Sequence, residues 1–134
     1  MKLIRNAVLV PYHEALRRIL VQDRRGYKPL PWGYFGGSIE AGETPLQAVL
    51  RQAREELSVS LSSTSLTSLG ECSGQFRDLK FSLYAFLWPF DGDLSAVEQR
   101  GGAGMEFVFV DEMMRHTEPG GPDHTLTLAL KRSL

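Results

Sequence analysis

Apolar positions along the chain fall into short runs, most of them rich in β-branched and aromatic residues. Such runs predict β-strands, because these side chains pack well on a pleated sheet. The run at residues 79–88 is apolar at nearly every position, which predicts a central strand with both faces covered. The predicted strands are Leu3 to Val10, Leu16 to Gln22, Tyr34 with Phe35 up to the Gly36–Gly37 pair, Leu66 to Glu71, Leu79 to Trp88 and Glu106 to Val110.

One stretch has helical periodicity instead. Thr44 is a favourable N-cap, Pro45 suits the first helical position, and Gln47 completes a capping-box pattern. Apolar residues then recur at helical spacing and predict one buried stripe, formed by Leu46, Val49, Leu50, Ala53 and Leu57. Two further helices are predicted at Asp111 to Arg115 and Asp123 to Arg132, and loops rich in glycine or proline at residues 24–33, 91–104 and 118–122.

Together these elements predict an α/β fold, with a mixed β-sheet sandwiched between α-helices. The 134 residues fit a single domain, residues 1–134. The net charge of -1 argues against a nucleic-acid-binding or membrane-surface protein. Cys72 is the only cysteine, so no intrachain disulfide can form, and the first residues lack a signal-peptide pattern. We therefore expect a cytoplasmic protein, and nothing in the pattern predicts its oligomeric state.

The predicted helix concentrates charge shortly after the glycine pair. With Leu46 at the centre of the buried stripe, Glu55 falls almost opposite the core, while Gln52 and Glu56 share one flank. Arg51 lies on the other side, one turn before Glu55. The two adjacent glutamates are then about 100° apart, near enough to converge on one hard cation such as Mg²⁺. The alternative is an ordinary solvated face carrying an Arg51–Glu55 pair.

The spacing of these residues resembles the signature of the Nudix hydrolases, a family that includes MutT-like proteins. That signature reads glycine, five residues, glutamate, seven residues, and then arginine-glutamate-aliphatic-any-glutamate-glutamate-any-glycine-aliphatic. The stretch at residues 37–59 matches it at Gly37, Glu43, Arg51, Ala53, Glu55, Glu56 and Val59. The resemblance implies a Nudix fold and a Mg²⁺-dependent enzyme, with Mn²⁺ as the other usable ion. Its reaction would be hydrolysis of a diphosphate linked to another moiety, often a nucleoside.

The same resemblance implies roles for individual residues. Glu55 and Glu56 would be metal ligands, together with a backbone carbonyl at Gly36 or Gly37. Glu43 and Arg51 would form a structural pair that fixes the loop against the helix.

Three charged residues outside the signature are further candidates for the site. A glutamate from a loop before a late strand often joins the metal site in the family, and Glu98 is the first candidate, with Glu106 second. For either residue the alternative is plain surface charge. Arg24 follows the second predicted strand, where the MutT-like pattern places a phosphate-contacting arginine. The alternative for Arg24 is a solvated turn.

Several aromatic side chains either stack on a base or pack in the core, namely Tyr27, Trp32, Tyr34, Phe76 and Tyr84.

Two positions depart from the signature: Gln52 stands in place of a glutamate and Ser58 in place of a glycine. A serine in a left-handed helix end costs about 1 kcal/mol. Gln52 matters more, because an amide carries no negative charge and accepts no proton. The number of metal ions and the identity of the general base therefore stay open. So does the alternative that the protein is a Nudix-fold module that binds a nucleotide without turning it over.

The substrate is open as well. Nucleoside triphosphates, oxidised deoxynucleotides, nucleotide sugars and dinucleoside polyphosphates all contain the required diphosphate. The expected partner is thus a small-molecule nucleotide or another nucleoside diphosphate derivative.

Overall fold

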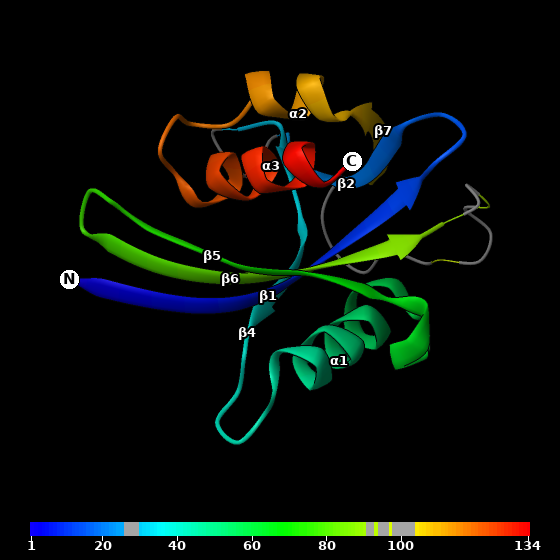
Figure 1. The fold of residues 1–134 in the computed structure, drawn as a ribbon, viewed down its shortest axis with the longest axis horizontal. Coiled ribbons are helices and arrows are strands. Elements are labelled where there is room, and N and C mark those ends of the chain that lie inside the picture. Colours follow the sequence, from blue (N-terminus) through cyan, green and yellow to red (C-terminus); the bar gives the residue numbers. More distant parts are fainter. Residues whose placement is uncertain (26–29, 91–92, 94–96, 98–103) are drawn as a thin grey trace.

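A mixed β-sheet forms the middle layer of the molecule, with α1 (Pro45–Leu57) on one face and with α2 (Val110–Arg115) and α3 (Pro122–Ser133) on the other (Figure 1). The computed structural model describes residues 1–25, 30–90, 93, 97 and 104–134. This layered arrangement confirms the predicted α/β fold. Within the described ranges, no helix is long and apolar enough to cross a membrane.

The elements follow the predicted order. The strands are β1 (Lys2–His13), β2 (Arg18–Asp23), β3 (Trp32–Gly33), β4 (Phe35–Ser38), β5 (Thr67–Phe76), β6 (Leu79–Pro89) and β7 (Met105–Phe109). The helices are α1 (Pro45–Leu57), the 3-10 turn η1 (Ser63–Ser65), α2 (Val110–Arg115) and α3 (Pro122–Ser133).

Several strand predictions need correction, beginning with β1, which runs past Val10 to His13, and β2, which begins at Arg18 and not at Leu16. The two-residue strand β3 lies inside the predicted loop at residues 24–33, because Trp32 pairs with Asp23 of β2 and this pairing overrides the proline and glycine signals. β4 does not end at the glycine pair but runs through it to Ser38. β5 continues to Phe76, beyond its predicted end, since it pairs with β6 as far as Leu79.

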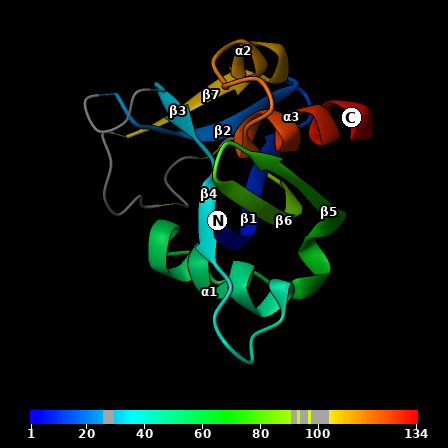
Figure 2. The ribbon, with the colours of Figure 1, turned by 90° about the vertical axis from the view of Figure 1, so that its left-hand side faces the viewer.

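Strand β1 is the organising strand of the sheet. It runs parallel to β6 from Lys2 to Tyr12, and on its other side it pairs antiparallel first with β4 and then with β2. β5 flanks β6, so β6 lies between two strands as predicted. β7 and β3 both pair with β2. Figure 2 shows β4 beside β1 on the side away from β6, with α1 beneath it.

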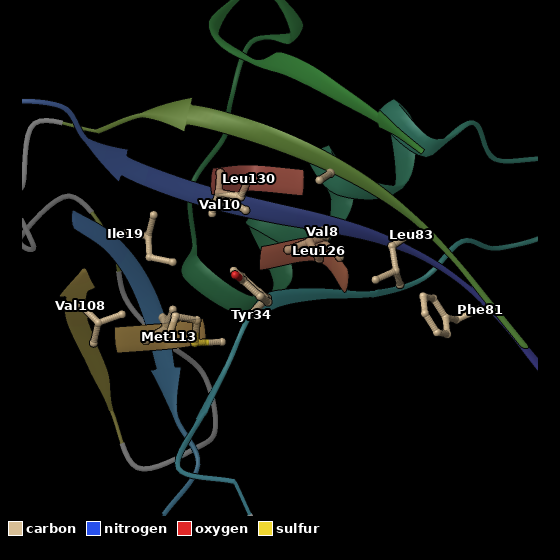
Figure 3. Packing of buried hydrophobic residues seen from close by; sticks show 12 residues of the cluster. Val8, Val10, Ile19, Tyr34, Phe81, Leu83, Val108, Met113, Leu126 and Leu130 are labelled. Carbon is tan, nitrogen blue, oxygen red and sulfur yellow. The ribbon is translucent and has the colours of Figure 1, made fainter. Parts of the chain in front are cut away.

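Alternating residues of β1 supply two separate cores. Val8 and Val10 belong to the core beneath α3, where they pack with Leu126 and Leu130 (Figure 3). The neighbouring positions, represented by Leu9, face α1 and pack with its buried residues. Because both faces of the sheet are covered, β1 and β6 read as continuous apolar runs in the sequence.

The glycine pair lets β4 lie very close to β1. Gly36 pairs with Val8 and has a φ of +135°, and a Cβ atom there would come within 2.2 Å of the Ala7 carbonyl oxygen. A side chain at this position would therefore be strained twice, by its backbone conformation and by a backbone clash. Gly36 is needed for close approach, not merely for a turn.

Replacing Gly36 with alanine should separate these two requirements. We expect Gly36→Ala to lower the free energy of unfolding by about 3 kcal/mol, because overpacking and an unfavourable φ each cost roughly 1–3 kcal/mol. Gly42→Ala is the matched control: its φ is +78°, and nothing lies within 4 Å of the added Cβ atom. The control should cost only about 1 kcal/mol in urea denaturation. Equal losses in the two variants would contradict the close approach.

Candidate active site

Helix α1 presents its polar residues to the outer edge of β4. The predicted start of the helix is confirmed, because the Thr44 side chain accepts a hydrogen bond from the Gln47 backbone N–H and Gln47 returns one to Thr44. The helix ends at Leu57 and is capped by Ser58, whose φ of 55° is left-handed. The buried face, however, is rotated from the predicted stripe toward β4. It consists of Ala48, Val49, Gln52, Ala53 and Leu57, while Leu46 and Leu50 are only partly buried.

Arg51 is the centre of an ion-pair network at this edge. Its guanidinium binds Glu43 through two hydrogen bonds, Nε to Oε2 at 2.8 Å and Nη2 to Oε1 at 3.0 Å. It also donates to Glu55 at 3.0 Å and to the Ser38 carbonyl oxygen at 3.0 Å. The predicted pairing of Glu43 with Arg51 is confirmed, and it ties the 40–43 turn to both α1 and β4.

The Arg51 guanidinium also sets the protonation of Glu43. Hydrogen bonds from Arg51, supported by one from the Glu40 backbone N–H, lower the pKa of Glu43 to about 2. Glu43 is thus charged at any physiological pH. Its charge is already matched by Arg51, so Glu43 is better suited to fixing the loop than to proton transfer.

Gln52 shares a flank of α1 with Glu56, as predicted, but this flank faces β4 and Gln52 belongs to the buried face of the helix. Its side chain is buried, with 4% of the residue exposed, and its Nε2 atom donates to the Ser38 carbonyl oxygen at 3.1 Å. The Oε1 atom is buried and has no hydrogen-bond partner among the described residues. A buried amide oxygen left without a partner costs about 1–3 kcal/mol.

Glu56 follows Gln52 by one turn and also faces β4. Its Oε2 atom accepts a hydrogen bond from the Gly36 backbone N–H at 3.0 Å. Burial raises the pKa of Glu56, and Glu55 raises it further, while the Gly36 hydrogen bond, Arg24 and Arg51 act in the opposite direction. Glu56 is therefore a partly buried carboxylate whose charge is only incompletely compensated by the protein.

The donor set at this edge fits a hard divalent cation. Glu56 lies beside the Gly36–Gly37 backbone, and Glu55 is close enough to act on its pKa. Mg²⁺ prefers one or two carboxylates, with carbonyl oxygens, waters and substrate phosphates completing its shell. In residues 1–25, 30–90, 93, 97 and 104–134, no group of three or more His, Cys, Asp or Glu side chains could hold a metal ion. The described residues thus offer two carboxylates and backbone oxygen, but not a complete protein cage.

Arg24 lies within electrostatic reach of Glu56 and of Asp123 on α3. It lowers the pKa of both Glu56 and Asp123 by its positive charge. Its guanidinium is held by the Gln22 side chain at 3.1 Å and by the Tyr34 carbonyl oxygen at 3.1 Å. Gly33 gives it room, since a Cβ atom there would meet the guanidinium carbon at 2.1 Å. Arg24 is a positioned cation beside the acidic edge, not a solvated turn residue.

The two candidates for the additional glutamate have different outcomes. Glu98 lies outside the described residues, so its assignment stays a prediction. Glu106 is on β7, and its Oε2 atom accepts a hydrogen bond from the Trp32 Nε1 atom at 3.0 Å. Its pairing partner Val21 belongs to the core beneath α2 and α3, so Glu106 lies on that face and not on the α1 face.

Asp123 is a polar residue that sequence reasoning treated only as the start of a helix. It lies in the first turn of α3, and burial raises its pKa while Arg24 lowers it. It lines a small cavity of about 150 Å³ together with Leu30 and Phe76. An acidic residue in the first helical turn is so common that the sequence offered no signal for this burial.

The candidate aromatic residues mostly pack within the fold. Tyr34 is buried in the α3-side core and its hydroxyl contacts the Thr127 hydroxyl at 2.5 Å. Tyr84 lies beneath the Arg5 guanidinium, and Trp32 contacts His116 edge-on. Phe76 borders the small cavity. Tyr27 lies outside the described residues.

A larger depression, of about 820 Å³, lies elsewhere on the molecule. It is bounded by the β1–β2 hairpin, by α2 and by the end of α3, with Tyr12, Arg115 and Lys131 among its lining residues. None of the carboxylates of the α1 edge lines it. Its size alone does not make it the site of chemistry, since it lacks the paired glutamates and the glycine backbone.

Comparison with known proteins agrees with this geometry. The family model of the NUDIX domain matches residues 3–129. The dihydroneopterin triphosphate diphosphatase of Escherichia coli strain K12 is 31% identical over 80 residues, which cover 60% of this chain and 50% of that protein. The diphosphatase of Shigella flexneri matches with the same identity and coverage. The chain thus spans about half the length of the curated relatives it matches.

Solved structures show the same fold. The solution structure of the E. coli ORF135 protein matches with a TM-score of 0.73 at 20% identity, over 98% of this chain and 91% of that one. The MutT NUDIX hydrolase from Burkholderia pseudomallei matches with a TM-score of 0.71 at 18% identity, over 100% of both chains.

The chain belongs to the NUDIX domain family. The resemblance inferred from residues 37–59 is confirmed by a match that extends over nearly the whole chain.

Acidification should expose the contribution of the Glu43–Arg51 pair. The pKa of Glu43 is about 2 in the folded protein, against an ordinary carboxyl value of 4.5. As the pH falls, the unfolded chain therefore takes up this proton first, so the stability from the pair is complete above about pH 4.5 and disappears toward about pH 2. We expect the free energy of unfolding to fall less steeply over this range in Glu43→Gln than in the wild type. Parallel curves from denaturant titrations would contradict this.

Proposed function

We propose that this protein is a Mg²⁺- or Mn²⁺-dependent hydrolase that cleaves the diphosphate linkage of a nucleoside diphosphate derivative, such as a nucleoside triphosphate, a deoxynucleoside triphosphate or a nucleotide sugar. One observation carries the proposal. The carboxylate of Glu56 is held on the Gly36 N–H, next to Glu55 and within the electrostatic reach of Arg24. Two carboxylates suited to a metal ion are therefore within electrostatic reach of an arginine suited to phosphate.

The residues of the chain would divide the work as follows. Glu55 and Glu56, with a backbone carbonyl at Gly36 or Gly37, would hold the divalent ion. When bound, such an ion polarises phosphoryl oxygens and lowers the pKa of a coordinated water. Arg24 would contact the diphosphate, because its planar guanidinium matches phosphoryl oxygens and is already oriented by Gln22 and Tyr34.

The reaction also requires the attacking water to lose a proton. Gln52 cannot take that proton, because an amide is not a base at neutral pH. The accepting group is therefore a carboxylate of the site, and Glu98 remains the candidate from outside the α1 edge. Glu43 is excluded from this role by its pKa of about 2 and its pairing with Arg51.

The organic part of the substrate would lie toward α3. The positive charge of Arg24 acts on both Glu56 and Asp123, and Asp123 lines the small cavity beside Phe76. A diphosphate at Arg24 would then direct the attached group toward that cavity. The matched relative is named for a triphosphate substrate with a heterocyclic ring, which is consistent with this direction.

A second function is favoured by one specific feature. Gln52 is a buried, neutral residue at a signature glutamate position, and its amide nitrogen donates to the Ser38 carbonyl oxygen. The corresponding hypothesis is a NUDIX module that binds a nucleotide without hydrolysing it. The two hypotheses differ in turnover, not in binding.

A substrate panel discriminates between them. The protein would be incubated with nucleoside triphosphates, nucleotide sugars, dinucleoside polyphosphates and dihydroneopterin triphosphate, with Mg²⁺, with Mn²⁺ and with EDTA, and products would be followed by ³¹P NMR. We expect metal-dependent cleavage of the diphosphate in at least one class. Saturable binding without cleavage of any compound would support the binding module and refute the hydrolase.

The variant Glu56→Gln should then remove most of the metal-dependent turnover. We expect a loss of at least about 100-fold, since even residues that only support metal ligands cost 10–100-fold. The fold should persist, because the amide oxygen of glutamine can still accept the Gly36 N–H. Glu112→Gln is the matched control, as Glu112 likewise accepts a backbone N–H, from Phe109 at 3.0 Å, but on α2. Activity within a few-fold of wild type in Glu56→Gln would make the metal assignment wrong.

A further inference from the structure

The carbonyl oxygen of Ser38 receives two side-chain donors from α1. Arg51 Nη2 lies 3.0 Å from it and Gln52 Nε2 lies 3.1 Å from it. A carbonyl oxygen can only accept hydrogen bonds, so the NH₂ end of the Gln52 amide must face Ser38. The orientation of this amide is thereby fixed, and its oxygen points away from Ser38.

Gln52 and Glu56 together hold the outer edge of β4. Glu56 binds the N–H of Gly36, and Gln52 binds the C=O of Ser38 two residues later. Gly37 lies directly against the Gln52 amide, since a Cβ atom there would be 3.4 Å from Nε2. Gln52 and Glu56, one helical turn apart, thus pair with one backbone N–H and one backbone C=O of β4.

A glutamate at position 52 could not make this contact. Both oxygens of a carboxylate are acceptors, and one of them would face the Ser38 carbonyl oxygen with no hydrogen between them. The extra negative charge would also lie one turn from Glu56. Such a site needs a cation to hold its oxygens together, whereas the amide holds β4 without one.

The oxygen end of the Gln52 amide also indicates that the residue serves to hold β4. Gln52 is 4% exposed, and its Oε1 atom has no hydrogen-bond partner among the described residues. The great majority of buried polar atoms in proteins have a hydrogen-bond partner, so an atom without one requires an explanation. Here the orphaned oxygen is the cost of using the amide nitrogen to hold Ser38.

We propose that Gln52 is a positioning residue that clamps β4 in the absence of metal, so that the free protein takes up a single divalent cation, at Glu55 and Glu56. The proposal rests on the metal dependence put forward as the protein's function. It goes beyond that function by assigning the number of ions and the reason for the glutamine. In this chain an amide replaces the signature glutamate, and its hydrogen bond to Ser38 holds the edge of β4 in position whether or not a metal ion is bound.

The test compares wild type with Gln52→Glu and with Gln47→Glu. Gln47 is the matched control, because it makes the same chemical change on the same helix while a glutamate can still accept the Thr44 N–H of the capping box. Each protein is melted in EDTA and in saturating MnCl₂. The number of bound Mn²⁺ ions per chain is counted from the electron paramagnetic resonance signal of free Mn²⁺, without nucleotide.

We expect one Mn²⁺ per chain in wild type and in Gln47→Glu, with a similar rise in melting temperature between EDTA and Mn²⁺. Gln52→Glu should melt lower in EDTA, gain more from Mn²⁺ and bind a second ion. Two or more ions in wild type, or identical melting and stoichiometry in Gln52→Glu, would overturn the proposal. A protein that shows the expected ion counts but hydrolyses nothing in the substrate panel would refute the proposed function and leave the clamp standing.

Discussion

The geometry of the site depends on the hydrogen bonds that join α1 to the outer edge of β4. The strand has only four residues and pairs with β1 on its inner side. Its outer side is held by α1 through Ser38, which accepts from Arg51 and Gln52, and through Gly36, which donates to Glu56. The remaining features follow from this contact. Gly36 must be glycine to let β4 approach β1, and Arg51 must reach both the strand and the 40–43 turn.

The distribution of charge around this contact supports the proposed metal site. Arg51 is shared among Glu43, Glu55 and, at 3.7 Å, Glu40, so one positive charge serves three carboxylates. Glu56 is partly buried and has a raised pKa. Under the proposed function, these two adjacent carboxylates would bind a divalent ion, and Arg24, whose charge acts on Glu56, would bind an anion. A phosphate-bound divalent ion satisfies both demands at once.

Local features of the sequence predicted the parts of the fold that local physics determines. The capping box at Thr44, the order of the strands along the chain and the pairing of Glu43 with Arg51 are all confirmed. β3 was missed because two residues become a strand only through their pairing with β2, which has no local signal. The phase of α1 was shifted because a hydrophobicity pattern counts Gln52 as polar, although its contact with Ser38 buries it.

The central claim is that a divalent ion binds at the junction of α1 and β4. The most direct test adds Mn²⁺ to ¹⁵N-labelled protein and follows paramagnetic broadening of the amide resonances. The account predicts that Gly36, Gly37 and Glu56 broaden at the lowest Mn²⁺ concentrations, while Phe109 and Arg115, which border the larger depression, keep their intensity. Early broadening at Phe109 and Arg115, with Gly36 and Glu56 unaffected, would contradict it.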